Sequence, residues 1–328
     1  MNDAPATGRV RTVGGDLPAD QLGVTDYHEH LFQVSPLLPG DELDDADAAR
    51  SEAAALHASG FQAIVDPTPI GLGRRPGALA NIAQWTGLRV VAATGVHRDA
   101  HYDEGHWLGE LDEAALGGRF AREVQLGIPA QDEPEQGEPA GGELAAGADG
   151  TPVRAGLIKT GIDYWRISPR ERVVLAAAAR AHAMTNAPIM VHLEQGSAGF
   201  EVLGLLAAAG VAAEAVVLAH VDRNPDPVLH AELAAAGAYL GYDGWARHRD
   251  WPDSVLVDCL IRSAAAGASD RLLIGGDVAR RSRFRAYGGM PGLAYLGERV
   301  LPRLRREAGD ELTDAVTRRN PARLLARF

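Results

Sequence analysis

The sequence predicts a (β/α)₈ TIM barrel, and three features favour this fold class. Eight short apolar segments rich in Val and Ile recur along the 328-residue chain, most of them closed by turn residues. Ala- and Leu-rich segments with helical spacing lie between most of these strands. No G-x-G-x-x-G motif follows the first strand, so an open dinucleotide-binding sheet has no support. Apolar strands that alternate with helices form a parallel sheet covered on its outside, and eight such units fit a barrel.

The predicted strands and helices follow one another along most of the chain. The strands span residues 22–30, 61–68, 88–95, 155–161, 187–194, 215–222, 238–244 and 271–277. Predicted helices include residues 44–60, 168–184, 198–210 and 225–237. All of these except 168–184 end in Gly, as helix C-termini commonly do. Residues 311–328 are predicted to form a C-terminal helix and cap.

Residues 129–151 interrupt this alternation. The segment is rich in Pro, Gly and Glu and has almost no large apolar side chains. Such a composition cannot bury enough apolar surface to fold alone, so we expect a flexible surface insertion before the fourth strand. Because strands and helices resume directly after it, the sequence predicts one domain over residues 1–328.

The composition restricts the classes of function. A formal charge of −12 argues against binding to nucleic acid or anionic membranes, which requires a positive field. Cys259 is the only cysteine; it lies in a helix-like apolar segment, where we expect a buried structural thiol. One thiol cannot form an internal disulfide, which fits a reducing compartment. No signal-peptide core or membrane-length apolar segment is present, so we expect a cytoplasmic protein.

Candidate metal ligands stand at the ends of several predicted strands. They are His28 and His30 on the first strand, His192 on the fifth, His220 on the sixth and Asp277 on the eighth. A spacing of two places His28 and His30 on the same side of a strand, so both can point into the barrel mouth. A single His at a strand end is more often a structural residue. The other seven His, however, mostly fall in predicted helices or loops. Active sites of TIM barrels lie where the strands end, so this set indicates a metal centre.

Lys159, on the fourth predicted strand, is the only lysine among 32 basic residues. It could be a surface lysine left by chance in an Arg-rich chain. The ligand set, however, exceeds what one tetrahedral ion needs, and two ions about 3.5–4 Å apart would use it all if an anion bridged them. A lysine buried near divalent cations is pushed towards the neutral amine, which can add carbon dioxide and become a carbamate anion. Arg cannot form this adduct, so the chemistry accounts for the residue type.

Motifs along nearly the whole chain resemble the phosphotriesterase-like family of the amidohydrolase superfamily. They are VTDYHEHL, IVDPTPIGLGRR, AGLIKTG, PIMVHLEQGSAGFEVL, VVLAHVDRNPDP, LLIGGD and NPARLLA. The resemblance implies two metal ions, most often zinc, with manganese or cobalt also accepted. It implies that His28, His30 and Asp277 hold the more buried ion and that His192 and His220 hold the more exposed one. Carbamylated Lys159 and a hydroxide would bridge the two ions.

The chemistry of such a site defines the expected catalytic roles. The ions lower the pKa of the bridging water, and the exposed ion polarises a carbonyl or phosphoryl oxygen. Asp277 is placed to take the proton and pass it towards the leaving group, while Lys159 supplies the bridge.

Two departures from the family pattern bear on the substrate. Gly244 stands where organophosphate hydrolases have a relay histidine, and Arg223 stands where a second acidic residue is expected after Asp222. His97 occupies a position at which acyl-homoserine lactonases commonly have a tyrosine. His97 is therefore a candidate for the substrate wall, with a structural loop histidine as the alternative.

The loops after the last two predicted strands are dense in Arg. This layout is similar to the family branch that opens phosphorylated sugar lactones, in which basic residues and a tyrosine hold the phosphate. The expected anion-binding residues are Arg247, Arg249, Arg280, Arg281 and Tyr287. For any single Arg, solvated surface charge or a subunit contact is the alternative.

We therefore expect a metal-dependent hydrolase of a lactone or carboxylic ester, with an anionic or phosphorylated sugar lactone as a candidate substrate. Slow phosphotriester hydrolysis is also expected, because the metals polarise either kind of oxygen. The alternatives are an amidohydrolase of small N-acyl amino acids and a non-catalytic barrel that binds a metal or small ligand. The resemblance also implies a homodimer.

Overall fold

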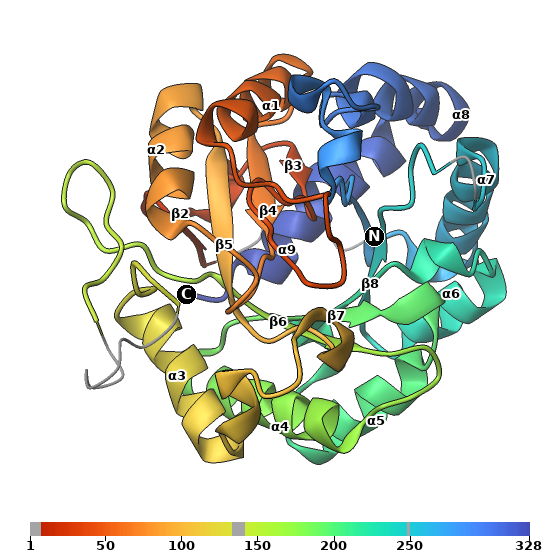
Figure 1. The fold of residues 1–328 in the computed structure, drawn as a ribbon. Helices are drawn as coiled ribbons and strands as arrows, with labels where there is room; N and C mark the ends of the chain where they lie inside the picture. Colours follow the sequence, from red (N-terminus) through yellow and green to blue (C-terminus); the bar gives the residue numbers. More distant parts are fainter. Residues whose placement is uncertain (1–7, 133–141, 248–249) are drawn as a thin grey trace.

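The strands form a closed parallel barrel with helices around it (Figure 1). The computed structural model describes residues 8–132, 142–247 and 250–328. Its eight barrel strands are β3 (Thr25–Asp26), β4 (Ala63–Asp66), β5 (Arg89–Gly95), β6 (Leu157–Ile162), β7 (Ile189–Leu193), β8 (Val216–Ala219), β9 (Tyr239–Tyr242) and β10 (Leu272–Ile274). The N–H of Tyr27 donates to the carbonyl oxygen of Ile274 at 3.1 Å and joins the last strand to the first. The predicted fold class is confirmed, and every predicted strand overlaps an observed one, with β6 ending one residue after the predicted 155–161.

Helices follow the strands along the chain. In the described residues they are α1 (Ala46–Ala58), α2 (Pro76–Thr86), α3 (Glu113–Gln125), α4 (Pro169–Thr185), α5 (Gly199–Ala208), α6 (Pro227–Ala235), α7 (Asp253–Ser263), α8 (Leu301–Asp314) and α9 (Asn320–Leu325). Helix α4 shows the local signals that set such bounds. A Ser168–Glu171 capping box opens it, and Asn186 in the left-handed conformation closes it. None of the described helices is both long enough and apolar enough to span a membrane.

The strands present alternate residues to two separate apolar clusters. One lies inside the barrel and includes Val91, Leu157, Met190 and Val217, whereas their sequence neighbours pack outward in the larger cluster with the helices. Lys159 and His192 follow Leu157 and Met190 by two residues, and so point to the same inner side. The barrel interior thus changes from apolar to ionisable towards the strand ends.

A two-stranded hairpin precedes the barrel. Strands β1 (Arg9–Thr12) and β2 (Gly15–Pro18) pair in antiparallel register, and Val10 packs into the inner cluster with Leu324 and Leu325 of α9. The two termini also meet, because the N–H of Arg9 donates to the carbonyl oxygen of Phe328 at 2.8 Å. The hairpin and α9 therefore pack against the apolar part of the barrel interior, on the side away from the ionisable residues.

The described ends of the 129–151 insertion are paired with each other. Pro129 and Leu144 form a β-bridge, and so do Ala146 and Pro152. Ala145 is buried, so this end of the insertion packs against the barrel. The rest of the predicted insertion, residues 133–141, lies outside the described residues.

Candidate metal centre

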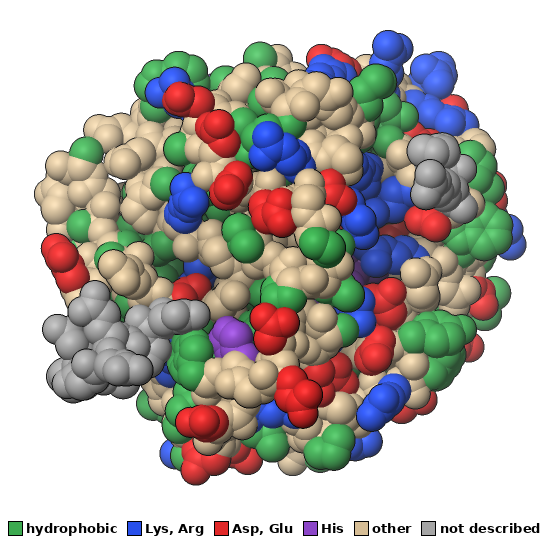
Figure 2. Space-filling view, viewed as in Figure 1, with side chains coloured by type: hydrophobic (Ala, Val, Ile, Leu, Met, Phe, Trp, Pro, Cys, Tyr) green, Lys and Arg blue, Asp and Glu red, His purple; other side chains and the backbone are tan. Residues whose placement is uncertain are grey.

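The predicted ligands come together at the C-terminal ends of the strands. His28 and His30 follow β3, Lys159 and His192 lie in β6 and β7, His220 follows β8, and Asp277 follows β10. All six are at most 7% exposed. The four His and Asp277 line one cleft of about 650 Å³, counted with its open mouth. Figure 2 shows Arg side chains, in blue, gathered around a hollow on the face that Figure 1 presents.

Three ligand atoms converge in the deepest part of the cleft. The Nε2 atoms of His28 and His30 lie 3.3 Å apart, and Oδ1 of Asp277 lies 3.6 and 3.8 Å from them. These atoms form one of two groups in the described residues with the spacing of metal ligands. Burial lowers the pKa of both rings, which are therefore neutral at pH 7.

The hydrogen bonds of these two rings fix their tautomers. Nδ1 of His28 lies 3.1 Å from the Asp243 carboxylate and must donate to it. Nδ1 of His30 lies 2.7 Å from Oγ1 of Thr68, and the single proton of that hydroxyl has two acceptors, Oδ1 of Asp66 at 2.6 Å and the carbonyl oxygen of Phe32 at 2.9 Å. Both Nε2 atoms therefore present lone pairs to each other and to Asp277. A divalent cation fits this arrangement, because the three lone-pair-bearing atoms would repel one another if no cation lay between them.

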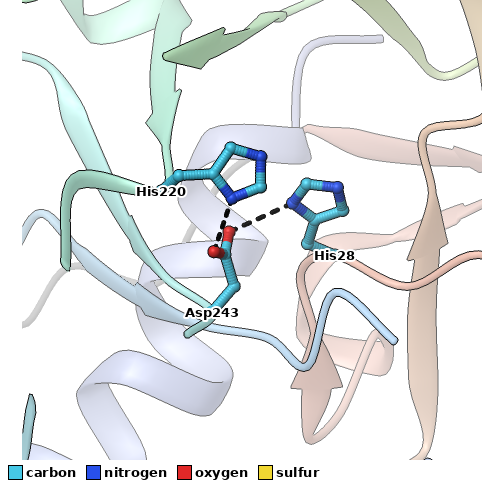
Figure 3. A group of neighbouring side chains, drawn as sticks. All are labelled: His28, His220 and Asp243. Carbon is cyan, nitrogen blue, oxygen red and sulfur yellow. Dashed lines mark hydrogen bonds and ion pairs between the residues drawn. The ribbon is translucent and has the colours of Figure 1, made fainter. Parts of the chain in front are cut away.

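Asp243 orients ligands from two strands at once (Figure 3). Its Oδ2 accepts from Nδ1 of His28 at 3.1 Å, and its Oδ1 accepts from Nδ1 of His220 at 2.6 Å. The Tyr27 hydroxyl is a third donor. Burial alone would raise the pKa of Asp243, but the hydrogen bond from His28 holds it below its usual value. Asp243 thus leaves Nε2 of both rings free for metal, the role that carboxylates play behind His ligands.

Sequence reasoning did not assign Asp243, although it directly follows β9 as His220 directly follows β8. The third donor to Asp243, the Tyr27 hydroxyl, reaches it because residue 241 is Gly. A Cβ at Gly241 would lie 1.7 Å from the Tyr27 hydroxyl oxygen.

Replacing Asp243 with Ala is expected to weaken metal binding by about 10–100-fold, because two ligand rings lose the acceptor that sets their tautomers. Competition titration of the metal-free protein with Zn²⁺ and a chromophoric chelator measures this change. Asp258→Ala is the matched control, since Asp258 is exposed on α7. Unchanged Zn²⁺ affinity in a folded Asp243→Ala protein would contradict the assignment.

Lys159 is wholly buried beneath these ligands. Its Nζ lies 3.3 Å from Sδ of Met190, a weak acceptor. Burial lowers the pKa of Lys159 to about 8. An ammonium here lacks the solvation that water would provide, so the surroundings shift the equilibrium towards the neutral amine relative to a lysine in water.

Two of the candidates also have unusual backbone conformations. His220 has φ of 67° and Asp277 has φ of 45°, in the left-handed region that non-Gly residues seldom adopt. Such strain persists only where surrounding structure imposes it, and it clusters at functional sites.

Arginines form one wall of the cleft. Arg223 donates to Oδ2 of Asp277 at 2.8 Å, and Arg247 donates to the same atom. Burial alone would raise the pKa of Asp277, but Arg247, with Arg223 as a further cation, holds it well below its usual range. Arg283 donates to the carbonyl oxygen of Trp245 at 2.9 Å, and burial followed by repulsion from Arg247 lowers its pKa to about 10. Among these three, the sequence predicted Arg247 as an anion ligand and included Arg283 only as part of the Arg-dense loop after the last predicted strand, whereas Arg223 was not predicted to bind an anion.

The other predicted substrate residues lie in different places. His97 lines the cleft, with its ring 4.6 Å from that of His192. Arg280 lines the rim and pairs with Asp41 at 3.3 Å. Arg281 lies over the ring of Tyr287 at 4.1 Å, and neither is among the described residues that line the cleft. Arg249 lies outside the described residues.

Comparisons with known proteins give the family. The model of the phosphotriesterase family matches residues 8–132 and 141–325. A phospho-furanose lactonase from Mycoplasmopsis agalactiae is 30% identical, with 97% of this chain and 91% of that protein covered. An N-acetyltaurine hydrolase from Danio rerio is 28% identical, with 97% and 98% covered. The crystal structure of a lactonase from Listeria monocytogenes has a TM-score of 0.86 at 29% identity, with 98% and 99% covered. The chain is therefore a hydrolase and belongs to the phosphotriesterase family.

Proposed function

We propose that this hydrolase uses two divalent metal ions to open an anionic sugar lactone. The observation that carries the proposal is the position of two features in one cleft. Lone pairs of His28, His30 and Asp277 converge at its base, and Arg223 and Arg247 reach Asp277 from its wall. The similarity to two lactonases, one of them acting on a phosphorylated furanose lactone by its name, supports the substrate class.

The donor set fits two ions of the zinc type, since it offers imidazole nitrogen and carboxylate oxygen. His28, His30 and Asp277 would hold one ion, His192 and His220 the other, and Lys159 as its carbamate would bridge them. Ions of this kind supply a hydroxide nucleophile at neutral pH and polarise a carbonyl oxygen. Manganese or cobalt would fit the same donors.

The arginine wall, formed by Arg223, Arg247 and Arg283, has hydrogen-bond donors that no protein acceptor uses among the described residues. Arg223 and Arg247 each use an Nη atom on Asp277, and the buried Nε atom of each has no acceptor in the part of the chain that the structure describes. Buried donors without acceptors are rare in folded proteins. Because both guanidinium groups line the cleft, the phosphate or carboxylate of a substrate would find charged donors there, beside Asp277.

Asp277 would lie between the arginine wall and the proposed metal ions. Its Oδ1 faces the two imidazoles and its Oδ2 faces the guanidinium groups. We propose that Asp277 takes the proton released in the attack on the carbonyl and delivers it to the ring oxygen of the opening lactone.

Arg283→Met is expected to lower kcat/KM for a phosphorylated lactone by about 10–100-fold, because one charge-assisted contact is lost. The unphosphorylated form of the same lactone should change by less than about threefold, since it lacks the group that the guanidinium binds. Steady-state kinetics on the matched pair measures the difference. Arg262→Met, at an exposed position of α7, is the control. Equal losses on both substrates would show that Arg283 has no role in anion recognition.

A substrate panel tests the function itself. The Zn²⁺-loaded protein would be assayed with a phosphorylated aldonolactone, its neutral form, an N-acyl taurine, N-acyl amino acids and a p-nitrophenyl phosphotriester. We expect kcat/KM to be highest for the phosphorylated lactone and low for the phosphotriester. The second candidate is hydrolysis of an anionic amide, which the same arginine wall and the similarity to an N-acetyltaurine hydrolase favour. Faster turnover of an N-acyl compound would replace the lactone proposal with this one.

A further inference from the structure

We infer that Glu194, held in place by Arg98, is the positioning residue of His192. This inference rests on the proposed two-ion site, in which His192 is a ligand of the more exposed ion. Glu194 follows His192 by two residues, at the end of β7. Its Oε2 lies 3.0 Å from Nε2 of His192 and 3.0 Å from Nη2 of Arg98.

The contact fixes which nitrogen of His192 carries the proton. A carboxylate only accepts hydrogen bonds, so Nε2 of His192 is the donor. Burial of the ring disfavours the doubly protonated form, which leaves a lone pair on Nδ1. His28, His30 and His220 are arranged in the opposite way, with Nδ1 bonded and Nε2 free. Among the four candidate ligand rings, His192 alone would bind metal through Nδ1.

Arg98 ties Glu194 to the neighbouring strand ends. One Nη atom of Arg98 meets Asp163 after β6 at 3.2 Å, and the other meets Glu194 after β7. Arg98 itself follows β5, and its backbone N–H donates to Nδ1 of His97 at 2.8 Å. The next residue after Glu194, Gln195, has φ of 52°, in the left-handed region. Arg98 therefore links the Glu194 carboxylate to the loop after β5, and Asp163 in turn fixes Arg98 from the loop after β6.

If the contact of Glu194 with His192 were a simple surface ion pair, removing Glu194 would change only the stability of the fold, and only slightly. The side chain of Glu194 is 21% exposed, and pairs between exposed groups contribute roughly 0–1 kcal/mol. Glu194, however, contacts a ring that is only 7% exposed and belongs to the candidate site. Its loss should therefore change the ring's tautomer and the affinity for one ion, and not only the stability of the fold.

The test compares Glu194→Ala and Glu194→Gln with the wild-type protein. Glu201→Ala is the control, because Glu201 is exposed on α5. In metal-free protein with ¹⁵N-labelled His, long-range ¹H–¹⁵N correlation reports the tautomer of each ring. We expect Nε2–H for His192 in the wild type and in Glu194→Gln, whose amide oxygen can also accept, and a mixture of tautomers in Glu194→Ala.

Stepwise Zn²⁺ titration is the second measurement. In Glu194→Ala the weaker ion should bind about 10–100-fold less tightly, while the tighter ion, assigned to His28, His30 and Asp277, stays within about twofold. Glu194→Gln should recover most of the loss. An Nδ1–H tautomer of His192 in the wild type, or two unchanged Zn²⁺ affinities in Glu194→Ala, would overturn the inference. If the wild type binds one Zn²⁺ while His192 has Nε2–H, the two-ion proposal fails and the assignment of Glu194 stands.

Discussion

Lys159→Arg is expected to lower lactone turnover by roughly 10³-fold, equivalent to about 4 kcal/mol of transition-state stabilisation. The reason is chemical, since a guanidinium stays protonated and cannot become a carbamate. A permanent cation would also lie beneath the ring nitrogens of His28 and His30, where two divalent ions are proposed. The variant should therefore lose the weaker ion entirely and bind the other less tightly. Turnover at saturating substrate and metal content after gel filtration measure these losses.

The single lysine allows a direct test of the carbamate. Protein reconstituted with Zn²⁺ and ¹³C-bicarbonate should show one ¹³C signal of a lysine carbamate, because the chain contains no second lysine side chain. Lys159→Met should abolish this signal, and Glu201→Ala should keep it. Reconstitution in buffer freed of carbon dioxide should slow the recovery of activity. Two tightly bound ions in Lys159→Arg would show that the bridge is something else.

The barrel could be predicted because parallel strands buried on both faces are nearly continuous apolar segments. Each predicted strand overlaps an observed one, and Lys159 and His192 fall at inward positions of β6 and β7. The hairpin of β1 and β2 was not predicted. Its second strand, GDLP, is only partly buried and carries no alternation of apolar and polar residues. The contacts with the chain terminus that accompany it depend on tertiary structure.

The sequence predicted the side chains of the candidate site that would face the metal. It did not predict the residues that orient those side chains through hydrogen bonds. His28, His30, His220 and Asp277 were recognisable because imidazole and carboxylate groups at strand ends suggest metal. Asp243 and Glu194 act through hydrogen bonds to those rings, and nothing in the sequence tells which ring nitrogen faces which carboxylate. Arg density indicated an anion site, but only the structure separates Arg283, which lines the cleft, from Arg281, which lies over Tyr287.

Asp277→Asn should separate metal holding from proton transfer. An Asn side chain keeps an oxygen that can face the imidazoles, but it cannot take up a proton as a carboxylate does. If Asp277 delivers a proton to the leaving oxygen, the loss of turnover in Asp277→Asn must increase with the basicity of that oxygen. Lactone opening releases an alkoxide, so we expect turnover to fall by roughly 10³-fold, about 4 kcal/mol. A p-nitrophenyl phosphotriester releases a stable phenolate, and its slower turnover should fall only about tenfold, because general acid catalysis contributes little there.

The two substrates serve as each other's control in one variant. Metal content must be measured in the same samples, because Asp277 also faces the proposed buried ion through Oδ1. Asp258→Asn, at an exposed position of α7, is the control for effects of an Asp→Asn substitution and of protein preparation that do not involve the site. Equal losses on both substrates, with metal lost in parallel, would confine Asp277 to holding the ion. Full turnover of the lactone would remove Asp277 from the proton path. A loss confined to the lactone at full metal content is the outcome that only proton delivery explains, since both substrates use the same ions and differ in the basicity of the oxygen that leaves.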